Sequence, residues 1–427
     1  MNKSQAIIPA KVGIQENELP QGWVMTTLGK ITQPIKKVKP ADKPQKEIFY
    51  LDIGGIDKAT NSIVNYKKYL GKDAPSRAQQ AIKKGDIAFA NVRPYLRNIA
   101  IVPNDLNGQV GSTGFCFLRP AQGIDYKYIY YWVLSNTFIN DITKYQKGSS
   151  YPAVTNKQIL ERDIPLAPPE QQKRIVAKIE ELFSHIDAGI EALKKAKQLL
   201  KQYRRSVLKA AVTGELTKEW REANNLSQES WQESTIGEIA RVQTGKTPKR
   251  SDERYWKHGT IPWLTSAATN DEFTHYAEQF VTQSAVDDGL KLFEPGTLLL
   301  AMYGEGKTRG QVTEITFQAT CNQACAAIIV DEEKVNRAFV RLRLYENYEE
   351  TRKAASGGNQ PNLNLSKVRE ISLPLPPLSE QLEIILQAEQ KFEAIRRLEK
   401  ELETQILKAE KNKQSVLASA FSGKIHQ

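Results

Sequence analysis

The stretch "IPLAPPEQQKRI", Ile164 to Ile175, and its near copy "LPLPPLSEQLEII", which begins at Leu373, decide how this chain is organised. Each copy is a run of apolar residues and prolines that leads directly into a helical pattern. Because proline cannot donate to a strand ladder and holds φ near helical values, each run ends a sheet and starts a helix. The sequence therefore predicts a domain boundary at each copy.

The two copies belong to a repeat that covers nearly the whole chain. The segment "SVLKAAVTGEL" returns as "SVLASAFSGKI" 209 residues later, at the far end of each repeat. Twice 209 is 418 of the 427 residues, so the sequence predicts a tandem duplication with an approximate two-fold axis. Further matched positions are Pro165 with Pro374, Trp23 with Trp231, and Gly29 with Gly237.

Each repeat ends in a long helix with one apolar stripe. The first helix is expected from Glu170 to about Val212 and the second from Ser379 to about Phe421, both with an apolar period near 3.6. Forty-odd residues at ~1.5 Å each make a rod of roughly 60 Å, longer than a small domain is wide. We therefore expect the helices to pack antiparallel on each other; packing on the core of their own domains is the alternative.

The helix ends carry capping signals. Ser379 is a candidate N-cap, with Glu380 in the first turn near the positive end of the helix dipole. Gly214 and Gly423 stand where a C-terminal glycine ends a helix.

The remainder of each repeat has a mixed pattern of strands and short helices. Apolar runs "DIAFANV", "GFCFL", "TLLLAMY" and "CAAIIV" predict strands, and "KYIYYWVLSNTFINDI" and "RAFVRLRLYENYEETRK" predict short helices. The expected fold class is α/β (mixed α+β), with two similar globular domains separated by two long antiparallel coiled-coil helices. The expected organisation is an N-terminal extension (1–18), a first globular domain (19–169), a central helix (170–218), a second domain (219–378) and a C-terminal helix (379–427).

Composition and charge narrow the class of protein. With 40% hydrophobic and 26% charged residues, and no apolar run of about 20 residues, the chain is expected to be a globular cytoplasmic protein without a membrane partner. The net charge is +11, which favours a polyanionic partner. Residues 170–218 carry eleven Lys/Arg against six Asp/Glu, whereas residues 379–427 carry eight of each.

The cysteines and histidines suggest neither disulfides nor a metal site. Cys116, Cys321 and Cys325 are an odd number, and the last pair runs into a buried-strand pattern, so packing is the expected role. The four histidines are scattered: His185, His258, His275 and His426.

Two segments resemble a phosphate-binding loop but lack its parts. "AMYGEGKT" has Ala301 where the first glycine belongs, and an extended pattern follows Thr308 instead of a helix. "ARVQTGKTP" has Ala240 at that place and Pro248 after the threonine. "NVRPY" likewise does not match the Asp/Asn-Pro-Pro-aromatic tetrad of adenine methyltransferases. Because no other catalytic cluster stands out, we expect no catalysis by this chain.

Polar, basic and aromatic loops remain, and their residue types suit DNA. Arg and Lys suit guanine edges or phosphates, Asn and Gln suit adenine, and Glu accepts from cytosine. A solvated loop side chain is an equally good interpretation of any single residue, but the sets lie at matching places in the two repeats. The candidates are Arg93, Tyr95, Arg97, Asn98, Lys147, Ser149, Ser150, Tyr151, Lys246, Thr247, Lys249, Arg250, Tyr303, Glu305, Lys307, Thr308, Arg309, Gln311, Asn359, Gln360 and Asn362.

In their order and duplication these motifs resemble the specificity subunits of type I restriction-modification enzymes. The resemblance covers residues 19–427 and rests on "LPQGW", "LGKI", "TGKTP", "GEGKTRG", "PLAPPEQ", "PLPPLSEQ" and the two closing segments. The first domain departs from the second, with "NVRPY" in place of "MYGEGKTRG", as independent target choice would produce.

The resemblance implies two target recognition domains that read a bipartite, asymmetric sequence in double-stranded DNA, held apart by the two helices. It also implies two modification subunits, which bind S-adenosylmethionine and methylate adenine, and two restriction subunits, which use ATP and Mg. None of these cofactors would belong to this chain. The half-sites are expected on one face of the DNA, about one turn apart.

Two other functions stay open at this point. One is a P-loop-like ATPase with a coiled-coil arm, which the glycine-lysine-threonine segments would serve. The other is a non-enzymatic interaction scaffold whose basic charge is incidental.

Overall fold

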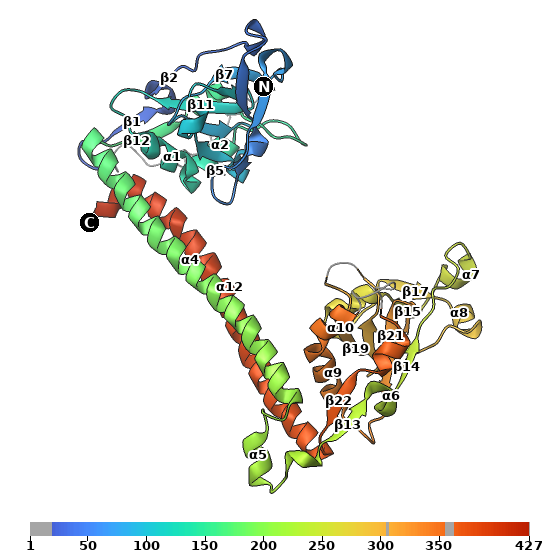
Figure 1. The fold of residues 1–427 in the computed structure, drawn as a ribbon. Coiled ribbons are helices and arrows are strands. Elements are labelled where there is room, and N and C mark those ends of the chain that lie inside the picture. Colours follow the sequence, from blue (N-terminus) through green and yellow to red (C-terminus); the bar gives the residue numbers. More distant parts are fainter. Residues whose placement is uncertain (1–18, 305–306, 355–362, 427) are drawn as a thin grey trace, which may run out of the picture. The chain divides into compact units, whose positions relative to one another are not determined.

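The computed structural model describes residues 19–304, 307–354 and 363–426. The chain divides into two compact units. Unit 1 comprises Met1–Lys194 and Thr404–Gln427, and unit 2 comprises Lys195–Glu403, so each unit contains one part of both long helices (Figure 1).

Unit 1 is built on two four-stranded sheets, with strand orders β6-β3-β10-β7 and β2-β11-β8-β9. It also has two further strand pairs, β1-β12 and β4-β5, and the pairing of β10 with β7 shifts register between Gly111 and Ser112. The strands are β1 Val24–Thr27, β2 Thr32–Gln33, β3 Glu47–Leu51, β4 Ile56–Asp57, β5 Ser62–Ile63, β6 Lys67–Leu70, β7 Ala78–Ala81, β8 Ile87–Ala90, β9 Ile99–Ile101, β10 Val110–Ser112, β11 Phe115–Pro120 and β12 Asp163–Leu166. The short helices are α1 Tyr126–Leu134, α2 Asn136–Thr143 and α3 Asn156–Leu160.

Unit 2 has a five-stranded sheet, β14-β21-β18-β19-β16, a three-stranded sheet, β17-β15-β20, and the pair β13-β22. Its strands are β13 Gln232–Thr235, β14 Ala240–Thr244, β15 Ile261–Leu264, β16 Phe273–Thr274, β17 Gln279–Val281, β18 Leu298–Ala301, β19 Val312–Ile315, β20 Thr320–Cys321, β21 Cys325–Val330 and β22 Ser372–Leu375. Its short helices are α5 Lys218–Ala223, α6 Ile236–Ile239, α7 Glu253–Trp256, α8 Gln283–Asp287, α9 Arg337–Glu346, α10 Tyr348–Ala354 and α11 Leu365–Arg369.

The duplication is visible in individual hydrogen bonds. In unit 1 the Trp23 indole donates to Gln171 Oε1 (2.8 Å), and in unit 2 the Trp231 indole donates to Glu380 Oε2 (2.9 Å). The next residue on each long helix repeats its bonds as well: Gln172 and Gln381 each donate to a carbonyl five residues earlier and accept from the N-terminus of a short helix. The strand pairs β1-β12 and β13-β22 have the same antiparallel register. The predicted repeat is therefore confirmed.

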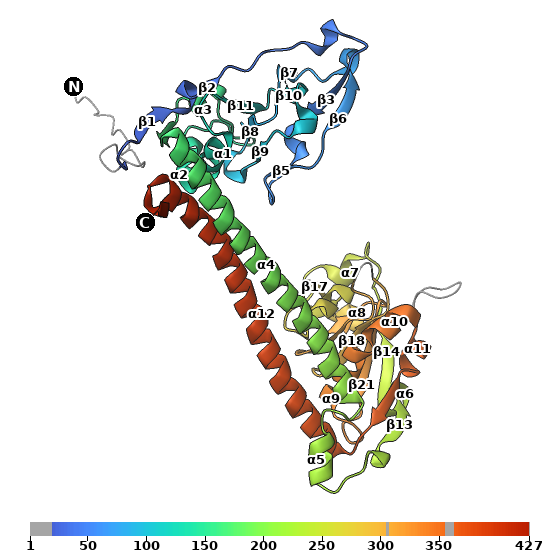
Figure 2. The ribbon, with the colours of Figure 1, turned by 60° about the vertical axis from the view of Figure 1, so that its left-hand side comes forward.

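The long helices are α4 (Pro169–Val212) and α12 (Leu378–Phe421), each of 44 residues. In unit 1 Lys413 pairs with Asp187 (2.6 Å) and lies over the Phe183 ring. In unit 2 Arg204 lies over the Phe392 ring (4.8 Å). Lys413 and Phe183 stand 209 residues from Arg204 and Phe392 respectively, so the same contact occurs twice. Within each unit the helices lie side by side and run antiparallel, as predicted (Figure 2).

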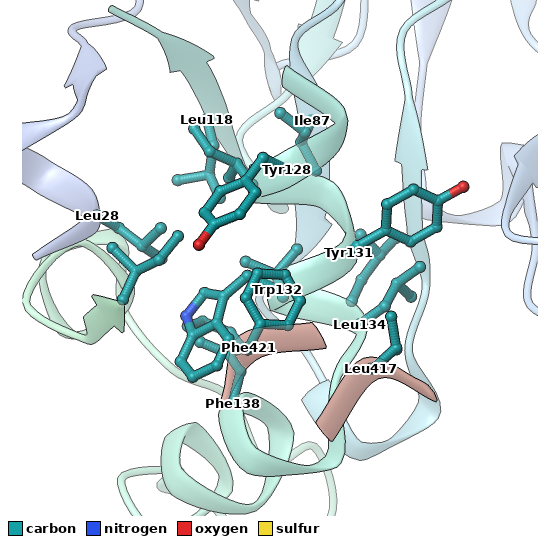
Figure 3. Close-up of a cluster of buried hydrophobic side chains, with 14 of the residues drawn as sticks. Leu28, Ile87, Leu118, Tyr128, Tyr131, Trp132, Leu134, Phe138, Leu417 and Phe421 are labelled. Atoms are coloured by element: carbon teal, nitrogen blue, oxygen red, sulfur yellow. The ribbon is translucent and has the colours of Figure 1, made fainter. Parts of the chain in front are cut away.

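The core of unit 1 includes the end of the chain (Figure 3). The Phe421 ring of α12 meets the rings of Tyr128 and Trp132 on α1 edge to face, with ring centroids 5.1 and 5.0 Å apart. All three side chains are buried. The apolar stripe of α12 thus packs on the globular part of unit 1 as well as on α4, because both surfaces need apolar cover.

Two details of the predicted helices are wrong. Helix α12 starts at Leu378, one residue before Ser379, which was the predicted N-cap. The backbone N–H groups of Glu380 and Gln381 both donate to the Pro377 carbonyl, so Pro377 is the N-cap residue. Each predicted short helix is two helices. The first divides into α1 and α2 at Ser135, whose hydroxyl caps α2 by accepting from Phe138 N, and the second divides into α9 and α10 at Asn347.

The glycine stops and the buried cysteines agree with the sequence analysis. Gly214 and Gly423 have φ of 76° and 74°, the left-handed conformation that ends a helix. All three cysteines are buried, and burial raises the pKa of the Cys116 thiol to about 12. Among the described residues, no three His, Cys, Asp or Glu side chains gather in a way that could hold a metal ion. Nor does any helix in the described part of the chain have the length and apolarity to cross a membrane.

Candidate nucleic-acid interface

In unit 1 the candidate loop follows β8 and has an unusual backbone. Arg93 and Arg97 both adopt the left-handed conformation, with φ of 49° and 52°. For residues with a side chain this conformation costs about 1–2 kcal/mol each. Hydrogen bonds hold it in place: Arg93 N donates to Pro152 O (2.7 Å), and the Asn61 side chain donates to Arg97 O (2.7 Å). The loop is thus held in one shape, which a surface for reading DNA requires.

The first two candidate loops of unit 1 lie together. Arg93 Nη2 donates to Ser150 O (3.0 Å), and its guanidinium lies 5.2 Å from the centre of the Tyr151 ring. Tyr151 and Tyr95 are 73% and 47% exposed, so both aromatic rings are open to a ligand. Exposed tyrosines beside an arginine suit contact with nucleotides. Lys147 and Ser149, in the same loop as Tyr151, are also exposed.

Arg97 lies against helix α2. Its guanidinium donates to Asn136 Oδ1, and burial lowers the pKa of the guanidinium from its ordinary value. Asn98 is half-buried beside it, and its carbonyl accepts from Ala90 N (3.1 Å). These two residues are placed at the base of the loop, while Tyr95 lies at its surface.

In unit 2 the corresponding loop follows β18. Met302 N donates to Ala324 O (2.7 Å), as Asn91 N donates to Gly114 O (2.9 Å) in unit 1, so the two loops start alike. The Tyr348 hydroxyl on α10 donates to Lys307 O (2.7 Å). Tyr303 and Lys307 are exposed, and Thr308, Arg309 and Gln311 are half-buried.

The loop of residues 245–250 meets this site through Gln323. Thr247 Oγ1 donates to Gln323 Oε1 (2.6 Å), and residue 323 lies next to Ala324, which contacts the start of the preceding loop. Arg250 lies over the rings of Trp256 (4.0 Å) and Trp263 (4.7 Å) and donates to Gln279 Oε1 (2.7 Å). Lys246, Lys249 and Arg250 are all exposed, but the guanidinium of Arg250 is held by these contacts within the protein.

Buried polar atoms without a hydrogen-bond partner gather at the matched loops. Among the described residues they include Asn91 Oδ1 and Arg93 Nε in unit 1 and Gln311 Oε1 in unit 2. Leaving such a group unpaired costs about 1–3 kcal/mol, so proteins avoid it except where a ligand or function requires it. Candidates Glu305, Asn359 and Gln360, with Asn362, lie outside the described residues.

One group of residues near the candidate interface of unit 1 was not predicted from the sequence. The lining of a cavity of about 410 Å³ includes the polar residues Lys37, Gln79, Gln80, Thr113 and Asn156. Asn156 Oδ1 accepts from Asn91 Nδ2 (2.8 Å), so this cavity adjoins the loop after β8. Thr113 lies in the turn before β11, and Gln323 lies in the matching turn before β21 in unit 2. A comparison of the two repeats could therefore have identified Thr113 from the sequence.

The structure does not support the ATPase alternative. After Thr308 the chain enters strand β19, so no helix N-terminus follows to hold a phosphate. The segment after Thr247 is likewise not helical until α7.

The chain belongs to the family described as type I restriction modification DNA specificity domain, which it matches twice, over residues 20–200 and 228–408. The family that the motifs resemble is thereby confirmed. A relative of similar length is the StySPI specificity subunit of Salmonella potsdam, 24% identical over 435 residues, with 96% of this chain and 91% of the relative covered.

Two solved structures resemble this chain over most of its length. One comes from work on complex assembly and conformational transition of the type I R-M system (27% identity, TM-score 0.75), and the match covers 95% of this chain and 99% of that one. The other is the HsdS subunit from Thermoanaerobacter tengcongensis (28% identity, TM-score 0.61), with 95% and 98% covered.

Proposed function

We propose that this chain is the DNA-sequence specificity subunit of a type I restriction-modification enzyme. The observation that carries the proposal is the pair of matched loops after β8 and β18. Both hold basic, aromatic and amide side chains, and both contain buried polar atoms without partners inside the protein. The exposed basic and aromatic side chains of these loops, Tyr95, Tyr303 and Lys307 among them, suit contact with DNA bases and phosphates.

Each unit reads one half of a bipartite target. The scaffolds of the two units repeat the same hydrogen bonds, but the loops differ: "NVRPY" in unit 1 stands where "MYGEGKTRG" stands in unit 2. Because similar scaffolds present different side chains, the two half-sites differ and the whole target is asymmetric. The recognition domains span residues 19–169 and 219–378.

The helices α4 and α12 set the spacing between the half-sites. Each helix of 44 residues is about 66 Å long at 1.5 Å per residue. A helix pair held by repeated contacts, such as Arg204 on Phe392 and Lys413 on Phe183, resists a change of length. The spacer between the half-sites is therefore constant.

The catalytic parts belong to partner subunits. Two modification subunits bind S-adenosylmethionine and methylate adenine, and two restriction subunits use ATP and Mg, while this chain supplies the sequence preference without an active site of its own. The assembly acts on double-stranded DNA in the cytoplasm. The relatives' description as specificity subunits and the structure solved for complex assembly support this division.

The test is to sequence the methylated adenines of a host with and without this gene. We expect a bipartite, asymmetric motif with a constant spacer that disappears when the gene is deleted and returns when it is restored. A methylation pattern that does not change on deletion would contradict the proposal. Swapping residues 19–169 for those of a relative should exchange one half of the motif only.

A further inference from the structure

Residues 30–84 of unit 1, which we call the lysine lobe, hold most of the chain's net charge. The segment contains thirteen Lys/Arg and five Asp/Glu, which leaves +8 of the +11 of the whole chain. All thirteen basic side chains are exposed. They are Lys30, Lys36, Lys37, Lys39, Lys43, Lys46, Lys58, Lys67, Lys68, Lys72, Arg77, Lys83 and Lys84.

The fold holds these lysines on a surface of ordered backbone. The lobe contains three strands of the sheet β6-β3-β10-β7, with a small core that includes Ile48, Tyr50 and Ala78. Val38 packs against this core and donates from its backbone to Gln79 O (2.9 Å). Because successive residues of an extended segment point to opposite sides, Lys37 and Lys39 are directed away from the core that holds Val38.

Most of this charge is not neutralised inside the lobe. Within residues 30–84, all of which are described, the ion pairs are Lys67 with Asp52 (3.4 Å) and Lys68 with Glu47 (2.8 Å). Both pairs are exposed and therefore weak. Like charges gathered on one small lobe repel each other, so the lobe is suited to a partner that brings a dense negative charge.

The lobe also reaches the candidate recognition loop of unit 1. Lys37, Gln79 and Gln80 line one side of the 410 Å³ cavity, and Asn156 lines the other. Asn156 accepts from Asn91 at the start of the loop after β8. A duplex that contacts this loop would therefore pass next to the lysines of residues 36–39.

The corresponding segment of unit 2 has no such charge. Residues 239–295 contain seven Lys/Arg and eight Asp/Glu, a net charge of −1. Several of its basic groups are engaged nearby: Arg254 pairs with Asp252 (2.8 Å), Lys257 pairs with Glu253 (3.1 Å), and Arg250 lies on two tryptophans. The two units thus share a scaffold but differ in this lobe by nine charges.

We propose that the lysine lobe is a sequence-independent binding surface for the phosphates of duplex DNA beside the half-site of unit 1, and that unit 2 has no equivalent. The position beside a half-site rests on the proposed function. Lysine suits this role because it is a flexible point charge that contacts phosphate without reading the base. Each phosphate that a lysine neutralises releases counterions, so the lobe supplies salt-dependent affinity that unit 2 does not.

The test compares two triple variants of the full-length chain by fluorescence anisotropy over a range of KCl concentrations. The first is Lys36→Gln, Lys39→Gln and Lys43→Gln in the lobe, which leaves Lys37 in the cavity unaltered. The matched control is Arg241→Gln, Lys257→Gln and Lys291→Gln in unit 2, which removes the same number of exposed charges. Each variant is measured with a random-sequence duplex and with a duplex that carries the methylated motif.

The lobe variant should bind both duplexes more weakly and show a less steep salt dependence. The slope of log K against log [KCl] should fall by about 0.9 for each phosphate that is no longer neutralised, and by up to about 2.7 for three. The control should keep the slope of the unaltered chain. The preference of the lobe variant for the motif over random sequence should stay the same, because lysines that bind phosphate do not read bases.

Three results would overturn the proposal. An unchanged slope in the lobe variant would mean that these lysines do not meet phosphate. Equal losses in both variants would mean that bulk charge is responsible. Competition by single-stranded RNA at or below the concentration at which duplex DNA competes would assign the lobe to another polyanion. If the unaltered chain shows no preference for any duplex, the proposed function is contradicted. A less steep salt dependence in the lobe variant would still support phosphate binding by the lysine lobe in that case.

Discussion

Replacing Glu380 with glutamine should destabilise unit 2 by breaking a buried ion pair. Glu380 is fully buried at the start of α12, and its carboxylate accepts from the Arg221 guanidinium, from Thr217 Oγ1 (2.7 Å) and from the Trp231 indole (2.9 Å). The Arg221 side chain is only 6% exposed. Glutamine keeps the shape and can still accept from Trp231, but it removes the charge that compensates Arg221.

The expected loss is about 3–5 kcal/mol in the free energy of unfolding of unit 2, because a buried charge then has no partner of opposite sign. Arg221 Nη2 keeps its bond to Gly214 O (3.0 Å), so the cost is that of an uncompensated charge and not of a wholly unbonded group. The assay is urea unfolding followed by tryptophan fluorescence, because the Trp231 indole touches the substituted side chain.

Position 171 supplies a matched control, because it stands 209 residues earlier in the repeat. Gln171 accepts from Trp23 as Glu380 accepts from Trp231, and it has no arginine partner among the described residues. Gln171→Ala should therefore cost only about 1 kcal/mol, the value of one hydrogen bond. The double variant Glu380→Gln with Arg221→Met should recover most of the loss, because it removes the charge left alone. If Glu380→Gln costs no more than Gln171→Ala, or if the double variant is no more stable than the single, the reasoning is wrong.

Three further predictions concern recognition, spacing and the buried thiol. Arg309→Ala should weaken binding by about 1–3 kcal/mol and relax the methylated motif in one half only, and a uniform loss over all sequences would assign Arg309 to phosphate. Deleting about four residues from each long helix should change the spacer of the methylated motif and leave both half-sites as they are; altered half-sites would contradict the spacing role. Iodoacetamide at pH 8 should not label Cys116 in the folded chain, because a thiol with a pKa of about 12 stays protonated below that pH, and labelling at the rate of an exposed cysteine would contradict its burial.

Several parts of the site followed from the sequence because they depend on neighbouring residues. The loops after β8 and β18 lie where a strand pattern gives way to glycine, proline and polar residues. The stops at Gly214 and Gly423 follow from the conformation that glycine permits. The charge of the lysine lobe was not predicted, although a count over residues 30–84 of the sequence would have found it.

Other parts could not be predicted, because they depend on which distant segments meet. Arg97 lies against Asn136, 39 residues away, and Arg250 lies over the rings of Trp256 and Trp263. Arginine is a residue type that often contacts DNA. In this fold, however, each of the two guanidinium groups already has a partner within the protein. The start of α12 at Leu378 was also missed, because the Pro377 carbonyl accepts the first helical bond and no side-chain cap marks this position in the sequence.

By itself, the sequence determined the duplication, the two long helices, their C-terminal ends and the family to which the chain belongs. These features follow from the apolar period of the helices and from the positions of proline and glycine. Such signals depend on a few neighbouring residues, and they recur after 209 residues. Only the tertiary structure decided which polar side chains are bound internally and which remain open to a ligand. Glu380 and Arg221 are 159 residues apart, and packing brings their charges together because burying either one alone would cost more than burying the pair.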